Sequence, residues 1–274
     1  MKTADFGSII RLTNEEHWGF GIRDLKRMMK LQPEGCLVAT LDGHPIGLTT
    51  TITYGKKLAW IGNVVVHRKH RGAGIGSNLV QSATKHLLRS HVKRIGLNSY
   101  PENRSMYERL NFKTVDGFVR LSISRRTRKI VSRNEEVPFR QILRLDKRAF
   151  GADRTRLLQR LLSEFPRGWT WILNGAQVSG YSVVKQYQDS SEIGPSISQQ
   201  MNQDATATLL QSSIALARKW PLELSVPESN QTVLEAASRL GFRVERKGVV
   251  MNFADLDTVT VSPAIVAFGF LDKG

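Results

Sequence analysis

Residues 60–77 read WIGNVVVHRKHRGAGIGS, and this stretch determines the kind of fold that the rest of the chain must build. Residues 60–66 are β-branched and nearly free of charge, which predicts a buried strand. The apolar residues of 77–88 recur at helical spacing, and glycines stand between the two segments. Such a turn lets the backbone approach an anion, which the free N–H groups of the helix start can bind. The sequence therefore predicts a phosphate-binding strand, turn and helix.

The spacing of the glycines narrows the kind of phosphate ligand. A Walker loop requires a Lys after the glycines, and none follows here. A dinucleotide fingerprint requires a third glycine one residue later than Gly76, and a βαβ unit with an acidic residue. The pattern that fits is Arg-x-x-Gly-x-Gly, formed by Arg71, Gly74 and Gly76. It resembles the coenzyme A pyrophosphate loop of the GNAT superfamily of N-acetyltransferases. The alternative is a glycine-rich turn that holds no ligand.

Length and composition indicate a soluble globular protein of one large or two ordinary domains. The chain has 274 residues, of which 41% are hydrophobic and 23% charged. No apolar run approaches the ~20 residues of a membrane helix, and residues 1–5 lack the apolar core of a signal peptide. The lone Cys36 cannot form an internal disulfide, which indicates a reducing compartment. We therefore expect a cytoplasmic protein without a membrane partner. No cysteine or carboxylate cluster completes a metal site, so we expect no metal.

The positive charge is concentrated in the first half of the chain. Residues 1–140 hold 25 Lys and Arg against 11 Asp and Glu, whereas residues 141–274 hold 15 against 13. Such an excess would attract an anionic cofactor, an acidic substrate or nucleic acid. The densest basic run, residues 125–129, contains no aromatic residue, and we interpret it as a solvated linker or strand end. Nucleic acid is not the expected partner.

The order of predicted elements in the first half is that of a mixed α/β protein. Residues 14–31 carry an apolar stripe typical of a helix, which includes Ile22, Leu25 and Met28. Residues 41–44 predict a hairpin turn, Leu-Asp-Gly-His. The remaining predicted elements are strands 36–40, 45–54, 94–98 and 115–124, and a short helix 101–110. Helix, hairpin, strand, helix, strand, helix and strand is also the element order of a GNAT domain.

Residues 97–112 supply a second resemblance. A segment of this stretch resembles the late GNAT motif: Tyr107-Glu108-Arg109-Leu110 followed by Asn111-Phe112, with Asn111 where glycine is usual. The resemblance implies that Tyr107 faces the sulfur of the cofactor and acts as general acid. A phenol with a pKa of ~10 can protonate a leaving thiolate without being ionised at neutral pH. The alternative is a packed tyrosine with a solvated hydroxyl. The resemblance also adds Asn103 to the cofactor-binding residues.

The second half repeats the first in a degenerate form. Gly43 and Gly175, and also Gly62 and Gly194, are separated by the same 132 positions. At this offset the residues of the phosphate loop are replaced by Gln203, Thr206 and Thr208, and Ala237 replaces Tyr107 when the phenylalanines of the late motif are aligned. We therefore expect the second copy to keep the scaffold without binding the cofactor.

This layout resembles a tandem subgroup of the family, an N-terminal GNAT domain followed by a degenerate domain of the acetyltransferase-domain-18 type. We expect an α/β (α+β) fold of two domains, residues 1–131 and 132–274, each a mixed, mainly antiparallel sheet flanked by helices. The sequence motif most specific to the subgroup runs from Asp146 to Arg154 and contains Ala-Phe-Gly-x-Asp-Arg. Two interpretations of its end stay open. Asp153 caps a helix and Arg154 lies at the surface, or both form a wall of a substrate pocket between the domains.

The resemblance implies that acetyl-coenzyme A lies in a splay between strands 60–66 and 94–98. Its pantetheine arm would pair with Val64, Val65 and Val66, where a backbone N–H could polarise the thioester carbonyl. Arg71 would contribute charge to the pyrophosphate. The backbone N–H groups that would bind the pyrophosphate belong to Gly72, Ala73, Gly74, Ile75, Gly76 and Ser77.

The general base is missing from its usual place. Many family members carry a Glu on the central strand, where this chain has Gly62 and Asn63. Either water and backbone groups relay the proton, or a carboxylate such as Asp24 or Asp153 is brought in from elsewhere. Trp18 could face an acceptor amine or could pack in the core. Trp18, Asp24, Asp153 and Arg154 are therefore the candidate substrate residues.

These observations favour an N-acetyltransferase that transfers the acetyl group of acetyl-coenzyme A to a primary amine, more often of a small molecule than of a protein. The alternative is a non-catalytic binding module, either a sensor of acetyl-coenzyme A or a basic protein associated with nucleic acid.

Overall fold

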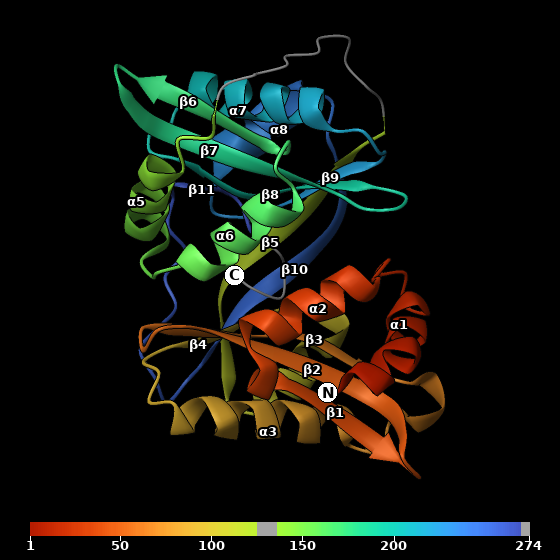
Figure 1. The fold of residues 1–274 in the computed structure, drawn as a ribbon. Coiled ribbons are helices and arrows are strands. Elements are labelled where there is room, and N and C mark those ends of the chain that lie inside the picture. The colour runs from red at the N-terminus through yellow and green to blue at the C-terminus, as the bar shows by residue number, and fades with distance from the viewer. Residues whose placement is uncertain (125–135, 270–274) are drawn as a thin grey trace. The chain divides into compact units, whose positions relative to one another are not determined.

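The computed structural model describes residues 1–124 and 136–269, which form two compact units (Figure 1). The first unit contains residues 1–115 and 250–259, and the second contains the described residues of 116–249 and 260–269. The domain boundary expected at 131/132 and the basic run 125–129 lie outside the described residues. Among these, no helix combines the length and the apolar character needed to span a membrane.

The elements of the first unit follow the predicted order. A three-stranded antiparallel sheet is joined by a fourth, parallel strand, and the later strands β5 and β10 add their ends to it. The elements are α1 (Phe6–Asn14), α2 (Ile22–Leu31), β1 (Cys36–Leu41), β2 (His44–Tyr54), β3 (Leu58–Val66), α3 (Ile75–Arg89), β4 (Ile95–Ser99), α4 (Pro101–Arg109), β5 (Phe112–Ile123) and β10 (Arg243–Phe253).

The single helix expected over residues 14–31 is wrong, because α1 ends at Asn14 and α2 begins only at Ile22. His17 and Gly19 adopt positive φ angles of 58° and 64°, which an α-helix cannot contain. The segment 15–21 is instead closed by a hydrogen bond of 3.2 Å from the Asn14 side chain to the carbonyl of Phe20. Ile22, expected in the apolar stripe, is 56% exposed, whereas Leu25 and Met28 are buried as expected.

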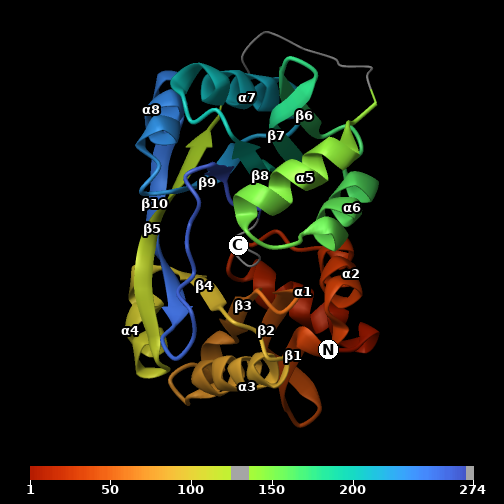
Figure 2. The ribbon, with the colours of Figure 1, turned by 90° about the vertical axis from the view of Figure 1, so that its left-hand side faces the viewer.

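The sheet of the first unit is covered on both faces. The helix α3 packs against β1, β2 and β3, and α1 packs against β2 and β3 from the opposite face (Figure 2). The hairpin between β1 and β2 turns at Asp42 and Gly43, which have φ angles of 48° and 79°, so the predicted turn is confirmed. The core beneath α1 and α2 consists of Phe6, Ile9, Leu12, Leu25, Met28, Cys36, Leu48 and Val65.

The second unit repeats this arrangement, as the sequence predicted. Its hairpin and its parallel strand pair match those of the first unit, and β8 and β9 pair over three residues, as β3 and β4 do. Helices α7 and α8 pack on each other, and α7 and α5 both contact the sheet. The elements are α5 (Phe139–Phe150), α6 (Thr155–Glu164), β6 (Trp169–Asn174), β7 (Gln177–Gln186), β8 (Ser191–Ser198), α7 (Gln203–Leu216), β9 (Leu222–Pro227), α8 (Gln231–Arg239) and β11 (Ile265–Ala267).

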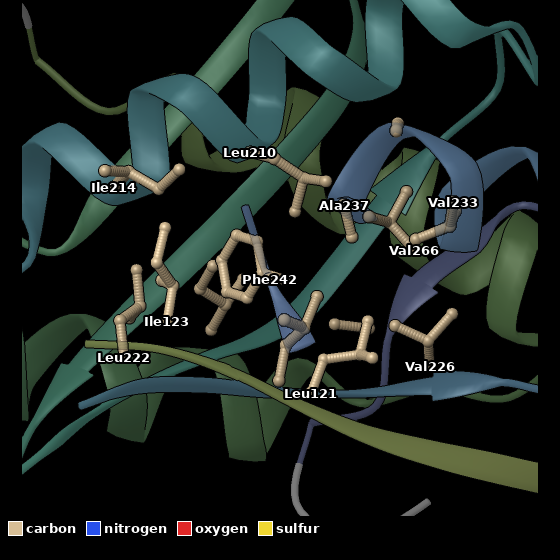
Figure 3. Close-up of a cluster of buried hydrophobic side chains, with 14 of the residues drawn as sticks. Leu121, Ile123, Leu210, Ile214, Leu222, Val226, Val233, Ala237, Phe242 and Val266 are labelled. Carbon is tan, nitrogen blue, oxygen red and sulfur yellow. The ribbon is translucent and has the colours of Figure 1, made fainter. Parts of the chain in front are cut away.

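The core of the second unit lies between its sheet and helices α7 and α8 (Figure 3). Leu121 and Ile123 of β5 point into this core toward Leu210 and Ile214 of α7. Burying each such side chain contributes about 1.5–3 kcal/mol to folding. Residues 116–123 of β5 therefore belong to the second unit, although their sequence precedes the second half of the chain.

Candidate active site

The glycine-rich turn places an open helix end after β3. Gly72 and Gly74 have φ angles of 82° and 77°, and a Cβ at either position would meet no atom within 4 Å. These two glycines are therefore required by backbone conformation and leave the space above the turn clear. Gly74 is the N-cap of α3, and within the described residues no side-chain cap hydrogen bond closes the start of this helix. Such N–H groups, aligned with the positive end of the helix dipole, form an anion site.

Arg71 is held in place beside the turn. Its Nε donates to the carbonyl of Val66 at 2.9 Å, and its guanidinium pairs with the Glu16 carboxylate at 2.5 Å. Arg68 also donates to the carbonyl of Glu15 at 2.8 Å and lies 3.6 Å from Glu16. The hydrogen bond from Arg71 holds the pKa of Glu16 below its usual value, and the charge of Arg68 adds to this effect. The α1–α2 segment 15–21 is therefore held against the glycine-rich turn.

Strand β3 is bulged next to the point where it leaves β4. Leu48 lies opposite Val65 and Thr50 opposite Gly62, so Asn63 and Val64 together face Thr49. Asn63 has a φ angle of 54°, a left-handed conformation that asparagine tolerates well. Its Nδ2 donates to Thr50 Oγ1 at 2.7 Å. The bulge was not predicted from the sequence. Gly62, a glycine inside the predicted strand and next to the bulge, is the signal that could have revealed it.

The ladder between β3 and β4 is short. It joins Ala59–Ile61 to Ile95–Leu97, and no described residue of β4 pairs with 62–66 of β3. The backbone of Val64, Val65 and Val66 therefore has an unpaired edge on the β4 side, where the sequence placed the pantetheine arm. An extended ligand can hydrogen-bond to such an edge as an added strand would.

Tyr107 lies on α4, one residue after a side chain that contacts the open turn. A Cβ at Gly76 would lie 3.6 Å from Met106 Sδ, so α4 packs against the first turn of α3. The Tyr107 ring is 6% exposed and meets Phe112 edge-on, with ring centroids 6.2 Å apart. Burial raises the pKa of its phenol, and the hydroxyl makes no hydrogen bond to a described residue. Asn103 is exposed on the first turn of the same helix.

The candidate substrate residues of the first unit occupy different environments. Asp24 is buried, accepts from the backbone N–H of Gly21 at 3.0 Å and pairs with Arg27 at 3.1 Å. Its carboxylate therefore begins helix α2 as a capping group. Trp18 is 36% exposed, and its ring centroid lies 5.5 Å from that of Phe20.

The other two candidates, Asp153 and Arg154, lie in the second unit. Asp153 precedes the N-cap residue Arg154, and its Oδ1 accepts from the backbone N–H of Thr155, the first residue of α6, at 2.9 Å. It therefore pairs with one N–H of the helix start, which agrees with the capping interpretation. Hydrogen bonds from Thr155, with a further one from Lys147, lower the pKa of Asp153 to about 2.

The surface position considered for Arg154 is wrong. Arg154 is 3% exposed and makes two hydrogen bonds to Asp146, and the Tyr181 hydroxyl donates to the same carboxylate at 2.5 Å. The paired carboxylate is what allows a guanidinium to be buried, and sequence alone did not reveal this partner.

The second unit differs from the first at the helix start, at the strand bulge and at the position of Tyr107. The side chain of Asn202 accepts from the N–H of Ala205 at 2.9 Å and so caps α7 from within the chain. The corresponding bulge of β8 contains Pro195, which has no N–H to offer. Ala237, in place of Tyr107, is fully buried in the core beside Phe242 (Figure 3). In residues 1–124 and 136–269, no group of three His, Cys, Asp or Glu side chains could hold a metal ion.

Comparison with known families agrees with this geometry. The model of the acetyltransferase (GNAT) family matches residues 6–112, and the model of an acetyltransferase (GNAT) domain matches residues 142–258. The chain belongs to the GNAT family. It carries two GNAT domains in tandem and is an acyltransferase, as the resemblance implied.

Related GNAT proteins match along most of the chain. Holothin acyltransferase from Pseudoalteromonas sp. (strain SANK 73390) is 24% identical over 238 residues, 83% of this chain and 74% of the relative. The uncharacterized N-acetyltransferase YitH from Bacillus subtilis (strain 168) is 24% identical over 253 residues, 89% of this chain and 87% of the relative.

Solved structures share the fold. A putative acetyltransferase from Pyrococcus horikoshii aligns with a TM-score of 0.83 and 22% identity over 100% of this chain and 94% of its own. A tandem GNAT protein from the clavulanic acid biosynthesis pathway aligns with a TM-score of 0.63 and 14% identity over 91% of this chain and 93% of its own. The mixed, mainly antiparallel fold expected from the sequence is confirmed.

Proposed function

We propose that this GNAT protein transfers the acetyl group of acetyl-coenzyme A to a primary amine of a small molecule, and that its first unit is the catalytic one. The observation that carries the proposal is the contrast between two equivalent helix ends. The end of α3 is capped by no side chain, whereas Asn202 caps α7. The open N–H groups of α3 suit a pyrophosphate, and the positive charge of Arg71 and Arg68 lies beside them.

The same unit offers groups for each step of acetyl transfer. Val64–Val66 would bind the pantetheine arm through their unpaired backbone edge, and an N–H at the Asn63 bulge would polarise the thioester carbonyl. The amine attacks this carbonyl, the C–N bond forms, and the C–S bond breaks. Tyr107 then protonates the departing thiolate, for which a phenol that stays protonated at neutral pH is suited.

The acceptor is proposed to be a small molecule because of the relatives' names. Two of them refer to holothin and to clavulanic acid rather than to a protein. Glu16 and Asp24 are paired with arginines. Because neither carboxylate then serves as a direct base, water and backbone groups would remove the proton from the amine. Asp153 and Arg154 remain candidates for acceptor binding, although both already serve structural roles in the second unit.

Calorimetric titration with acetyl-coenzyme A tests the proposal. We expect one site per chain and complete loss of binding in Gly74→Asp, because the new carboxylate repels the pyrophosphate. Gly43→Asp is the matched control, since Gly43 also has a positive φ and open space but lies in the β1–β2 turn. Unchanged binding by Gly74→Asp would exclude the loop as the cofactor site. Two sites per chain would show that the second unit also binds, and no binding by the wild type would favour a basic binding module.

A further inference from the structure

The open end of β3 is lined by uncharged polar groups. The Asn63 amide lies on the α2 side of the sheet, with Nδ2 2.7 Å from Thr50 Oγ1 and 3.7 Å from Met28 Sδ. The residues of β3 and β4 include no Asp or Glu, and Asn98 is the polar residue of β4 that precedes Ser99. An amide does not take up a proton at neutral pH. A substrate at this end of β3 therefore meets neutral dipoles.

Two of the three carboxylates among residues 15–24 are already paired with arginines. Glu16 pairs with Arg71, and Asp24 pairs with Arg27 and caps α2. The third, Glu15, is exposed to solvent. A substrate ammonium bound here would have to compete with an existing ion pair for its counter-charge, which costs free energy in a partly buried site.

The same segment offers apolar surface. Phe20 packs against the core cluster that contains Met28 and Val65, and the Trp18 ring lies 5.5 Å from Phe20. Trp18 and Ile22 remain 36% and 56% exposed. Exposed aromatic side chains beside a substrate site bind flat apolar groups by stacking and area burial. Apolar surface therefore continues from the bulged strand outward along residues 18–22.

We propose that the acceptor is an aromatic amine that is uncharged at neutral pH, held by Trp18 and Phe20 with its nitrogen toward the Asn63 bulge. This inference rests on the proposed acetyl transfer. An alkylamine with a pKa near ~10.4 is neutral in only about one molecule in 10³ at pH 7, so it would need a base to react. A weakly basic amine is unprotonated at pH 7, so its lone pair is available for the attack.

The reaction balances without a base on the protein. The neutral amine forms the C–N bond, the C–S bond breaks, and the nitrogen releases one proton to solvent water. The thiolate receives one proton from Tyr107, which is reprotonated from solvent. One acetyl group and one proton have then been exchanged between nitrogen and sulfur, and no oxidant or reductant is required.

Two isomeric acceptors of equal size test the proposal, 4-ethylaniline and 2-phenylethylamine, each with saturating acetyl-coenzyme A. At pH 7 we expect kcat/KM to be at least about tenfold higher for the aniline, because its neutral fraction is near one. Between pH 7 and 9, kcat/KM for phenylethylamine should rise about tenfold per pH unit while that of the aniline stays flat. Equal use of both isomers at pH 7 would overturn the proposal.

Two variants separate the roles of the residues. Trp18→Ala should raise KM for 4-ethylaniline with little change in kcat, whereas Leu41→Ala, which removes an exposed leucine at the β1–β2 hairpin, should change neither. Asn63→Asp keeps the shape and tolerates the left-handed backbone, and it supplies a carboxylate. We expect it to raise the activity on phenylethylamine relative to 4-ethylaniline at pH 7. An unchanged KM in Trp18→Ala would contradict the proposed acceptor surface.

The two proposals fail in different ways. If acetyl-coenzyme A does not bind in calorimetry, the proposed acetyl transfer fails and this inference fails with it. If acetyl-coenzyme A binds at one site but neither the aniline nor other anilines are acetylated while alkylamines are, the proposed function stands and the acceptor class is refuted. If it binds and no amine of either class is acetylated, the acceptor class is likewise refuted.

Discussion

Tyr107 combines burial with a hydroxyl that has no described partner, and this combination has a measurable consequence. We expect Tyr107→Phe to lower kcat by about 10²–10⁴-fold, the usual contribution of a general acid. Affinity for acetyl-coenzyme A should hold, and so should the melting temperature, because the lost hydroxyl breaks no hydrogen bond with the described chain. Steady-state kinetics and thermal melting measure the two effects.

The raised pKa of Tyr107 also predicts how kcat depends on pH. The phenol stays protonated above pH 10, so it should cause no fall in kcat on the alkaline side up to that pH. A kcat in Tyr107→Phe within twofold of the wild type would exclude its role as acid. A large drop in melting temperature in the same variant would indicate a structural role instead.

Arg154 illustrates a buried charge that depends on one partner. We expect Arg154→Leu to destabilise the protein by about 3–5 kcal/mol, because the variant leaves the Asp146 carboxylate buried without its guanidinium. Urea unfolding followed by circular dichroism measures the loss. Arg156→Leu, two residues later in α6, is the comparison, because Arg156 is exposed and its replacement should change stability much less. Equal losses in both variants would argue against the ion pair as the cause.

Asp153 makes a smaller, pH-dependent contribution. Its lowered pKa means that the carboxylate stabilises the folded protein above its ordinary pKa, and that this contribution is lost as the pH falls toward about 2. We therefore expect Asp153→Ala to cost about 1 kcal/mol at pH 7, the usual value of a helix cap. The gap between variant and wild type should narrow as the pH falls from 5 toward 3, and a gap that widened would contradict the capping role.

The α1–α2 segment is the element whose charge acts on the proposed cofactor site. Glu16→Gln removes a carboxylate that engages Arg71 beside the anion-binding turn. We expect acetyl-coenzyme A to bind several-fold more tightly to this variant at low salt, with the gain falling as ionic strength rises. Glu15→Gln is the control, because Arg68 is bonded to the carbonyl of Glu15 rather than to its carboxylate. Weaker binding by Glu16→Gln would show that Glu16 positions Arg71 for the ligand.

Elements defined by local chemistry were predictable, and elements defined by distant partners were not. Asp42, Gly43, Gly72 and Gly74 have positive φ angles, and the glycines and the Asp-Gly pair mark these turns in the sequence. The break before α2 was missed because the helix of Ile22, Leu25 and Met28 was extended back to residue 14, across Gly19 and Gly21. The pairing of Glu16 with Arg71 joins residues 55 positions apart. No periodicity reports a contact of that kind.

At the scale of the whole molecule, the two compact units are not two consecutive pieces of sequence. Residues 250–259 complete the first unit, where Phe253 meets Phe112 with ring centroids 5.4 Å apart. The backbone N–H groups of Ala254 and Asp257 also donate to the carbonyls of Asn111 and Lys93 at 2.9 and 3.0 Å. Phe112 in turn supports Tyr107.

The contribution of residues 250–259 to the first unit predicts the behaviour of a truncated chain. We expect a fragment of residues 1–131 to melt at a lower temperature than the whole protein and to bind acetyl-coenzyme A more weakly, because its sheet lacks the end of β10. Melting curves and calorimetry on both chains measure the difference. A fragment that matched the full chain in both would show that residues 250–259 are dispensable to the first unit.

The contribution of residues 250–259 also affects when the first unit can fold during synthesis. Translation proceeds from the N-terminus, so residues 1–115 leave the ribosome while residues 250–259 are still to be synthesised. Domains that are continuous in sequence can fold as soon as they emerge. Here the first unit cannot be completed until residues 250–259 have also been synthesised. Until then Phe112 lacks the ring of Phe253 that it contacts in the finished unit.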